Sequence, residues 1–196
     1  MRNRLKPVLA ILAATPLAAC LSFGAKPPPF LMTLTPAQSV APDTQRSAGP
    51  GEAITVYVPG TPAELNTIRV PVRSGGNTVT YLKDAQWVEA PARLFQQLLA
   101  TTVAARTGKI VLNPRQATID PGYRIVGDLD HFGLDSDRME VVVTYDALKQ
   151  GRGGERIDSR RFEARVPVSG ATPTAVTAGL NAAANQVAAQ VADWVR

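Results

Sequence analysis

The sequence has few of the residues that usually carry chemistry, with one cysteine and one histidine among 196 residues. A lone cysteine forms no intramolecular disulfide, so the fold depends on its hydrophobic core. The serine motif Gly-x-Ser-x-Gly does not occur, which leaves no obvious nucleophile for covalent catalysis. His131 lies in a strand-like segment, where a packed or surface role is favoured over catalysis or metal binding. We therefore expect no enzyme, no metal and no dissociable cofactor.

Long apolar runs and a strong charge of one sign are also missing. The apolar run at residues 8–14 is too short to cross a bilayer as a mature helix, and no later segment is longer. The net charge of +5 includes Arg2, Arg4 and Lys6, which precede this run. Losing them with a leader would leave a weakly basic chain, which argues against nucleic acid as a partner.

These basic residues and the apolar run lead into Leu17-Ala18-Ala19-Cys20, the arrangement of a signal peptide spanning residues 1–19. Small residues before the only cysteine resemble the lipobox of bacterial lipoproteins. The resemblance implies cleavage before Cys20, a diacylglycerol on its thiol and a fatty acyl chain such as palmitate on its amine. Two or three acyl chains hold a protein on a membrane almost permanently. The alternative is an ordinary secretory signal that leaves Cys20 as a free thiol.

The residue after the cysteine bears on sorting. In enterobacterial lipoproteins an Asp at this position retains the protein in the inner membrane, whereas this chain has Leu21. By that resemblance we expect a lipid anchor in the outer membrane, with the protein on the periplasmic face.

Proline and small polar residues dominate residues 20–51, which predicts a partly extended tether. Within it, Phe30-Leu31-Met32-Thr33-Leu34 has strand character and is a candidate edge strand. The folded domain is expected from residue 52 to residue 196.

Three short strands are expected early in this domain. Residues 54–58 alternate between apolar and polar side chains, which is the period of a half-buried strand. Residues 68–73 and 78–82 flank a Ser-Gly-Gly-Asn turn and pair as a hairpin, with Pro71 at an edge or a bulge. Residues 109–112 form a further short strand.

The period changes to that of a helix over residues 89–106. Pro91 suits the first helical turn and Gly108 the C-terminal cap. One apolar stripe predicts packing on a sheet, and its members are Val88, Ala92, Phe95, Leu99, Thr102 or Val103, and Arg106.

The last third of the chain predicts three long strands and a second helix. Residues 123–132, 139–148 and 157–168 are joined by polar turns, so a meander with one core-facing and one solvated face is expected. Thr172 followed by Pro173 starts a helix that runs to the end of the chain. The sequence thus predicts an α+β fold, a two-layer sandwich with a mostly antiparallel sheet and two helices on one face.

These elements, in this order, resemble the family of ABC-type transport auxiliary lipoproteins, which includes the lipoprotein of the paraquat-inducible intermembrane lipid transport system. Besides the lipobox, the resemblance rests on residues 30–36, on the strand at 54–58, on residues 65–70 and on residues 122–132. It also rests on Tyr81 followed six residues later by Trp87. This chain departs from the family pattern at Val126-Gly127-Asp128 and at His131-Phe132-Gly133.

The resemblance implies a non-enzymatic accessory subunit of an ABC transporter that moves phospholipid or other hydrophobic molecules across the envelope. Its partner would be a periplasmic protein with a mammalian-cell-entry (MCE) domain, which works with a permease and an ATPase. An exposed edge strand would also permit homo-oligomers. Two alternatives are a structural envelope lipoprotein and a cell-wall-acting enzyme.

Four residues are candidates for a partner or lipid surface. Tyr81 and Trp87 would either pack the hairpin against the first helix or face a lipid or partner. Arg161 and Arg165 belong to a basic strip that is either a solvated sheet face or a docking patch for an acidic partner.

Two other patterns lack the residues of a site. The aspartates around Asp128 miss the bidentate Glu of a calcium loop, because Met139 stands at the twelfth position. The glycines at residues 151–154 lack the Lys-Ser/Thr of a phosphate loop and indicate a turn.

Overall fold

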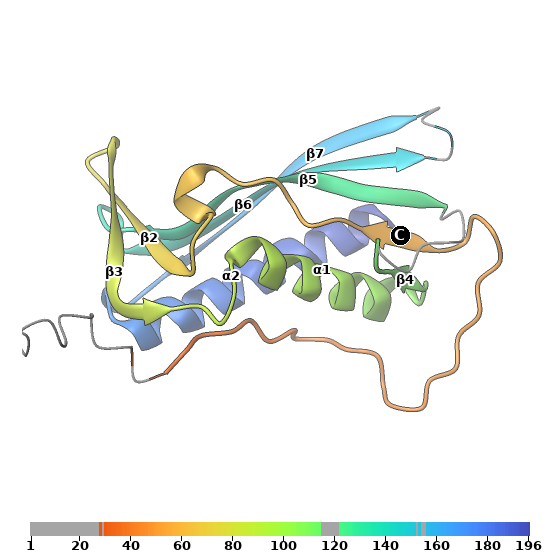
Figure 1. Cartoon of the computed structure of the whole chain (residues 1–196), viewed down its shortest axis with the longest axis horizontal. Helices are drawn as coiled ribbons and strands as arrows, with labels where there is room; N and C mark the ends of the chain where they lie inside the picture. Colours follow the sequence, from red (N-terminus) through yellow and green to blue (C-terminus); the bar gives the residue numbers. More distant parts are fainter. Residues whose placement is uncertain (1–27, 29, 115–121, 152, 154–155) are drawn as a thin grey trace, which may run out of the picture.

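The structure is a computed structural model that describes residues 28, 30–114, 122–151, 153 and 156–196. The two helices and seven strands of this part confirm the predicted α+β class (Figure 1). In chain order the elements are β1 (Ile54–Val56), the 3-10 helix η1 (Ala63–Leu65), β2 (Arg69–Ser74), β3 (Thr78–Gln86), α1 (Pro91–Thr107), β4 (Val111–Leu112), β5 (Tyr123–Asp135), β6 (Glu140–Gly151), β7 (Ile157–Pro167) and α2 (Pro173–Trp194).

Strand β5 organises the sheet. Strand β6 pairs antiparallel along one edge of β5, and β7 pairs antiparallel with β6, so the predicted meander is confirmed. The other edge of β5 is shared by two parallel strands, β1 at its start (Ile54 opposite Tyr123) and β2 at its end (Val72 opposite Leu134). The predicted hairpin is β2 with β3, and β4 extends the sheet beyond β1. The sheet is therefore mixed, with antiparallel pairing dominant.

Both helices lie on the same face of the sheet, as predicted (Figure 1). Helix α1 begins at Pro91, and Gly108 takes the left-handed φ of 71° that ends it. Helix α2 is capped by the Thr172 hydroxyl, which accepts a hydrogen bond from the Ala175 N–H at 3.3 Å.

The core lies between the helices and the sheet. Two pairs of fully buried aromatic rings meet edge to face there, Phe95 with Tyr145 at 5.1 Å and Trp87 with Phe132 at 5.6 Å between centroids. Helix α2 buries mostly alanine and valine, which lets it approach both the sheet and α1.

The outer face of the sheet, opposite the helices, contains more buried side chains than predicted. Val142 and Thr144 of β6 point to this face but are buried. Their direct neighbours on β7 are Arg165 and Glu163, whose long side chains can cover them. The alternation of inward and outward side chains in β6 identifies the two faces correctly. It does not predict that long side chains of β7 cover Val142 and Thr144.

The predicted tether is docked on the domain over much of its length. Residues 32–46, called the strap below, run along the helix layer (Figure 1). The Thr35 N–H donates to Asn181 Oδ1 at 2.8 Å, the Ala37 N–H donates to Asn185 Oδ1 at 2.7 Å, and Asn185 Nδ2 donates to the Thr35 carbonyl at 3.0 Å. Of the strand expected at residues 30–34, only a parallel bridge between Met32 and Trp87 forms.

The strap is fixed at its far end by a side chain. Arg46 Nη1 donates to the carbonyls of Ala104 and Lys109, both at 3.1 Å. The free part of the tether is therefore shorter than the sequence predicts, because two asparagines of α2 and one arginine of the strap satisfy backbone groups that a free chain would leave to water.

Gly179 sets how closely α2 approaches the sheet. A Cβ at this position would lie 2.8 Å from Val168 Cγ1 and 3.0 Å from Val141 Cγ2. We predict that Gly179→Leu lowers the free energy of unfolding by about 1–3 kcal/mol through overpacking, as measured by urea denaturation. The matched control is Ala178→Leu at the exposed neighbouring position. Equal stability of the two variants would contradict the close packing.

Candidate interaction surfaces

Cys20 lies outside the described residues, so its lipidation stays a prediction from the sequence. The other four candidate residues are described, and the structure separates them into three different environments.

Trp87 belongs to the core and not to a surface. Its side chain is fully buried beside Phe132, and its backbone N–H donates to the Ile68 carbonyl at 2.7 Å. This burial leaves no part of the ring for a lipid or partner surface, and packing of the hairpin against the first helix stays a prediction. Burial of this large ring explains why a tryptophan stands just before the helix.

Tyr81 is half-buried on β3 and is held within the protein on two sides. The Arg69 guanidinium lies 4.0 Å from the centre of its ring, and its hydroxyl lies 3.5 Å from the Glu64 carbonyl oxygen. This stacking occupies one face of the ring. Tyr81 and Trp87 thus do not form one aromatic surface.

Arg161 is exposed on the outer face but is paired. Its Nε donates to Asp146 Oδ1 at 2.7 Å, and its Nη2 donates to Asp130 Oδ2 at 3.0 Å. A β-bulge between Leu129 and His131 brings Asp130 to this face, since Leu129 and Phe132 both point to the core with two residues between them instead of one.

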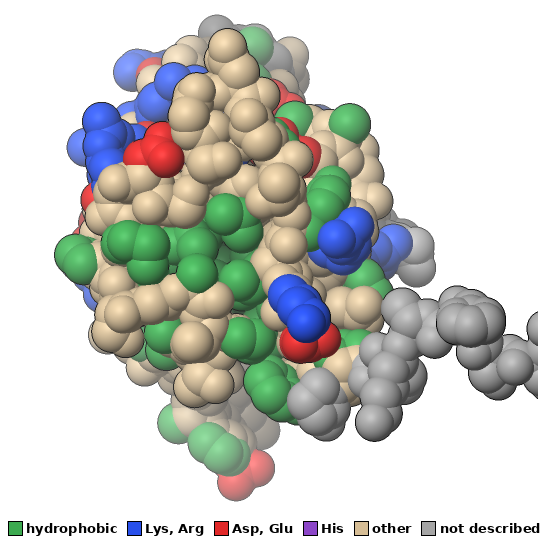
Figure 2. Space-filling view, turned by 90° about the vertical axis from the view of Figure 1, so that its left-hand side faces the viewer, with side chains coloured by type: hydrophobic (Ala, Val, Ile, Leu, Met, Phe, Trp, Pro, Cys, Tyr) green, Lys and Arg blue, Asp and Glu red, His purple; other side chains and the backbone are tan. Residues whose placement is uncertain are grey.

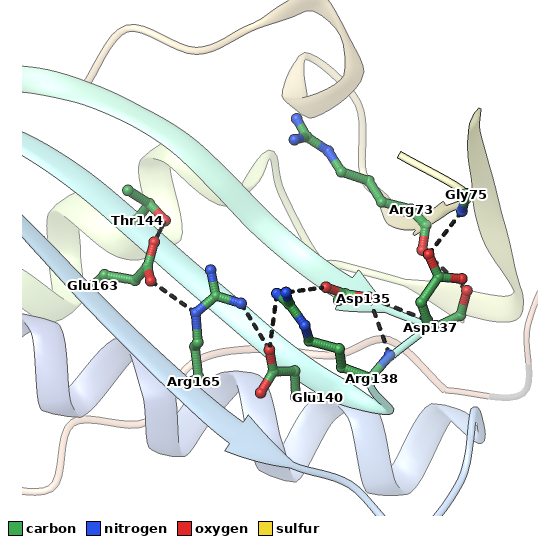
Figure 3. A network of polar contacts seen from close by, with 10 residues as sticks. Arg73, Gly75, Asp135, Asp137, Arg138, Glu140, Thr144, Glu163 and Arg165 are labelled. Carbon is green, nitrogen blue, oxygen red and sulfur yellow. Dashed lines mark hydrogen bonds and ion pairs between the residues drawn. The ribbon is translucent and has the colours of Figure 1, made fainter. Parts of the chain in front are cut away.

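Arg165 is also paired. Its Nε donates to Glu163 Oε1 at 2.8 Å and its Nη1 donates to Glu140 Oε1 at 2.7 Å (Figure 3). Glu163 in turn accepts a hydrogen bond from the Thr144 hydroxyl at 3.0 Å. The network continues to Arg138, which lies 3.8 Å from Asp135 and 4.0 Å from Glu140.

The acids in these networks respond to their partners. Hydrogen bonds from Arg161 lower the pKa of Asp146, and a hydrogen bond from Arg165 lowers the pKa of Glu163. Burial, together with its neighbour Asp146, raises the pKa of Asp130. The predicted basic strip is thus a network of alternating positive and negative charges. Of the two interpretations of the strip, this favours a solvated sheet face and disfavours a docking patch for an acidic partner.

His131 lies on the outer face beside a shallow pocket of about 330 Å³. The pKa of His131 is lowered mainly by burial and further by the positive charge of Arg73, so the imidazole is neutral at pH 7. The lining contains both arginines and aspartates, with Arg73, Asp135, Asp137 and Arg138 around the opening.

The aspartates at this end of β5 serve the turn. Asp137 Oδ2 accepts a hydrogen bond from the Gly75 N–H at 2.8 Å, and Asp135 Oδ1 accepts one from the Asp137 N–H at 3.1 Å. Across the described ranges, no group of three or more His, Cys, Asp or Glu side chains is placed to hold a metal ion.

A surface that the sequence reasoning missed lies where the strap begins. Four large apolar side chains are exposed there, Phe30 at 47%, Leu31 at 53%, Ile68 at 39% and Val88 at 51%. We call these four residues the apolar end. Figure 2 looks at this end of the molecule and shows hydrophobic side chains gathered near its centre, with charged side chains around them.

Backbone hydrogen bonds bring the apolar end together from three segments. The Trp87 N–H donates to the Ile68 carbonyl, the Met32 N–H donates to the Gln86 carbonyl at 2.8 Å, and the Val88 N–H donates to the Met32 carbonyl at 2.9 Å. Val88 was expected in the buried stripe of α1. It is exposed because the helix begins only at Pro91 and Val88 extends the line of β3 instead.

Within the part of the chain that the structure describes, neither helix has the length and hydrophobicity needed to cross a bilayer.

Comparisons with known proteins give one family and two similar folds. A family model described as ABC-type transport auxiliary lipoprotein component matches residues 32–192. A crystal structure of an uncharacterized protein is 14% identical, with a TM-score of 0.66, over 74% of this chain and 93% of the other. The crystal structure of a Xanthomonas campestris protein is 18% identical, with a TM-score of 0.66, over 85% of this chain and 93% of the other.

A third structure, a PelC dodecamer from Paraburkholderia phytofirmans, is 11% identical with a TM-score of 0.38, over 73% of this chain and 95% of the other. No curated protein matches the sequence. At 14% and 18% identity the first two structures support the fold alone.

The ion pairs of Arg165 generate a pH-dependent prediction. Since Arg165 lowers the pKa of Glu163, the pair stabilises the fold above 4.5, the ordinary pKa of this carboxyl, and the contribution is lost as the pH falls through the lowered value. We expect Arg165→Gln, which keeps a long side chain over Val142, to lower the thermal unfolding midpoint slightly at pH 7 and to match the wild type at acidic pH.

The control for this experiment is Arg124→Gln, an exposed position on the same face for which the described residues provide no ion pair. A loss of stability in Arg165→Gln that is independent of pH would show that the pairing contributes nothing and that packing accounts for the effect.

The contacts of Asn185 predict how the strap can be released. Asn185→Ala removes both hydrogen bonds that this side chain makes with the strap, at Thr35 and Ala37. We expect proteases to cleave residues 35–50 faster in this variant, while the free energy of unfolding falls by only about 1 kcal/mol. The exposed neighbour variant Gln186→Ala should keep the wild-type cleavage rate. Unchanged cleavage in Asn185→Ala would mean that these bonds do not hold the strap.

Proposed function

Because this chain belongs to the family of ABC-type transport auxiliary lipoprotein components, we propose that it is a lipid-anchored subunit of the outer membrane that assists an MCE-type ABC transporter. The family itself establishes a membrane-anchored envelope protein and an auxiliary role in transport. The outer membrane, the MCE-domain partner and the hydrophobic cargo are the proposed refinements.

The observation that carries the proposal is the family match over residues 32–192 together with the lipobox at Cys20. The match begins at Met32, where the strap meets the domain, and ends near the end of α2. Leu21 after the lipobox supports the outer membrane as the destination, because an aspartate at this position is the known retention signal. We therefore treat the lipid anchor and the folded domain as two parts of one transport auxiliary subunit.

The mechanism follows from this arrangement. Acyl chains on Cys20 would hold the chain on the bilayer, and residues 21–31 would form the connection to the domain. The strap continues this connection along α2 and fixes the domain to it through Asn181 and Asn185. The domain then presents the sheet and its edge strands β3 and β7 to the periplasmic partner.

The polar chemistry of the described surface suits a binding role. Its arginines are joined to carboxylates on the same sheet face, and such lattices give an interface orientation and selectivity more than affinity. Edge strands β3 and β7 would also permit copies of the chain to pair, although their exposed charged residues make that pairing selective.

The proposal predicts what accompanies the protein in its own cells. We expect the acylated wild type, solubilised from outer membranes with mild detergent, to co-purify with an MCE-domain protein. Mass spectrometry of the same sample should find diacylglycerol and an acyl chain on Cys20. The variant Cys20→Ala should leave the membrane fraction and lose the partner, whereas Ser22→Ala, two residues further on, should retain both.

Repeated absence of an MCE-domain protein from the acylated sample would contradict the transport partnership. A bare thiol on Cys20 in the mature protein would contradict the anchor.

A further inference from the structure

The apolar end and the path of the chain to Cys20 meet at one place. The strap begins at Met32, which is buried against Trp87, and the two residues before it, Phe30 and Leu31, are exposed. Ile68 and Val88 belong to the neighbouring segments, which backbone hydrogen bonds join to Trp87 and to Met32. The chain therefore leaves the domain towards Cys20 through a surface of large apolar side chains.

The length of this connection limits the distance to the bilayer. Phe30 is ten residues from Cys20 in the sequence. Even a fully extended chain of this length spans at most roughly 35 Å. Because the strap is docked, this reach is measured from the apolar end itself and not from the start of β1. An acyl chain on Cys20 thus keeps the apolar end within about this distance of the lipid.

We infer that the apolar end docks on the bilayer that holds the acyl chains, with Phe30, Leu31, Ile68 and Val88 inserted at the level of the lipid headgroups. This inference rests on the lipid anchor of the proposed function. It goes beyond it by giving the domain a fixed orientation on the membrane. The apolar side chains gain burial in lipid, and the anchor supplies the high local concentration that a surface this small requires.

The charges around the apolar end permit this contact. Arg69 follows Ile68, and Glu89 follows Val88, so both signs are present at the rim. Arg69 is turned onto the Tyr81 ring, 4.0 Å from its centre, and Glu89 accepts a hydrogen bond from Gln97 Nε2 at 2.9 Å. Arg69 and Glu89 carry opposite charges, so together they have no excess negative charge that an anionic bilayer would repel.

Docking at this end orients the rest of the domain. The end of β6 and the start of β7 lie at the opposite end of the long axis from the apolar end (Figure 1). Ile157, the first residue of β7, is 58% exposed. With the apolar end on the bilayer, the end of β6 and the start of β7 point into the periplasm, away from the lipid.

The experiment uses the full acylated chain and one added thiol, which is unique because Cys20 carries lipid. Val88→Cys is labelled with an environment-sensitive fluorophore, and the protein is reconstituted into vesicles of phosphatidylethanolamine and phosphatidylglycerol that contain spin-labelled quencher lipids. The matched control is Ile157→Cys, an exposed apolar position far from the apolar end. We expect a blue shift and quenching several-fold stronger at position 88 than at position 157.

A second set of variants tests the surface itself. Adding Leu31→Asp to labelled Val88→Cys should abolish the quenching. Adding Val58→Asp, an exposed apolar position at 48% that lies outside the apolar end, should leave it unchanged. Circular dichroism and unfolding curves establish that each variant is folded.

The remaining outcomes separate this inference from the proposed function. Acylated Cys20 with an unquenched label at position 88 overturns membrane docking and leaves the anchor intact. A blue shift that depends on protein concentration without vesicles assigns the apolar end to a second copy of the chain, and one that requires the MCE-domain protein assigns it to that partner; both overturn the inference. A bare Cys20 overturns the anchor and the docking together.

Discussion

Close packing of α2 on the sheet is the constraint on which the rest of the structure depends. The helix buries small side chains, among them Ala183, Ala184 and Ala188, and at Gly179 the side chains of Val141 and Val168 leave no room for a Cβ. Small residues let the helix axis approach the sheet, and dense packing makes the arrangement sensitive to one added side chain. The docking of the strap and the α1–α2 contact both depend on the position of this helix.

The two faces of the sheet divide the tasks of the domain. The inner face with the helices supplies stability through the rings of Phe95, Tyr145, Trp87 and Phe132. The outer face carries ion pairs that are exposed to solvent and contribute little to stability. Along β7, Arg161 and Arg165 are each held between carboxylates, so the charges on this face are paired within the protein.

The elements of the fold are predictable from the sequence because their signals are local. Pro91, Gly108, Thr172 and Pro173 mark helix ends through backbone chemistry, and alternation marks the strands. The parallel pairing of β1 and β2 with β5 was not predicted, because two strands sharing one edge leave no local signal. The bulge at Asp130 likewise depends on the register between strands.

The candidate surface residues show the same division. The side-chain type predicted correctly that Arg161 and Arg165 are exposed. Apart from Glu163 on β7 itself, their carboxylate partners come from β5 and β6, which only the register brings opposite β7. Two roles were open for Trp87, packing inside the protein and contact with a lipid or partner, because an aromatic ring suits a core and an interface equally well. The apolar end escaped prediction because Ile68, Val88, Phe30 and Leu31 come from three segments, none of which is apolar enough alone.

The direction of the strap has a mechanical consequence. Thr35 is bound to Asn181 and Ala37 to Asn185, so the strap and α2 run in the same direction along their contact. A pull on the amino terminus acts along this line of bonds and loads them together in shear, instead of opening them one after another as in a zipper. Force from a moving membrane would therefore reach α2 before it reached the short strand β1.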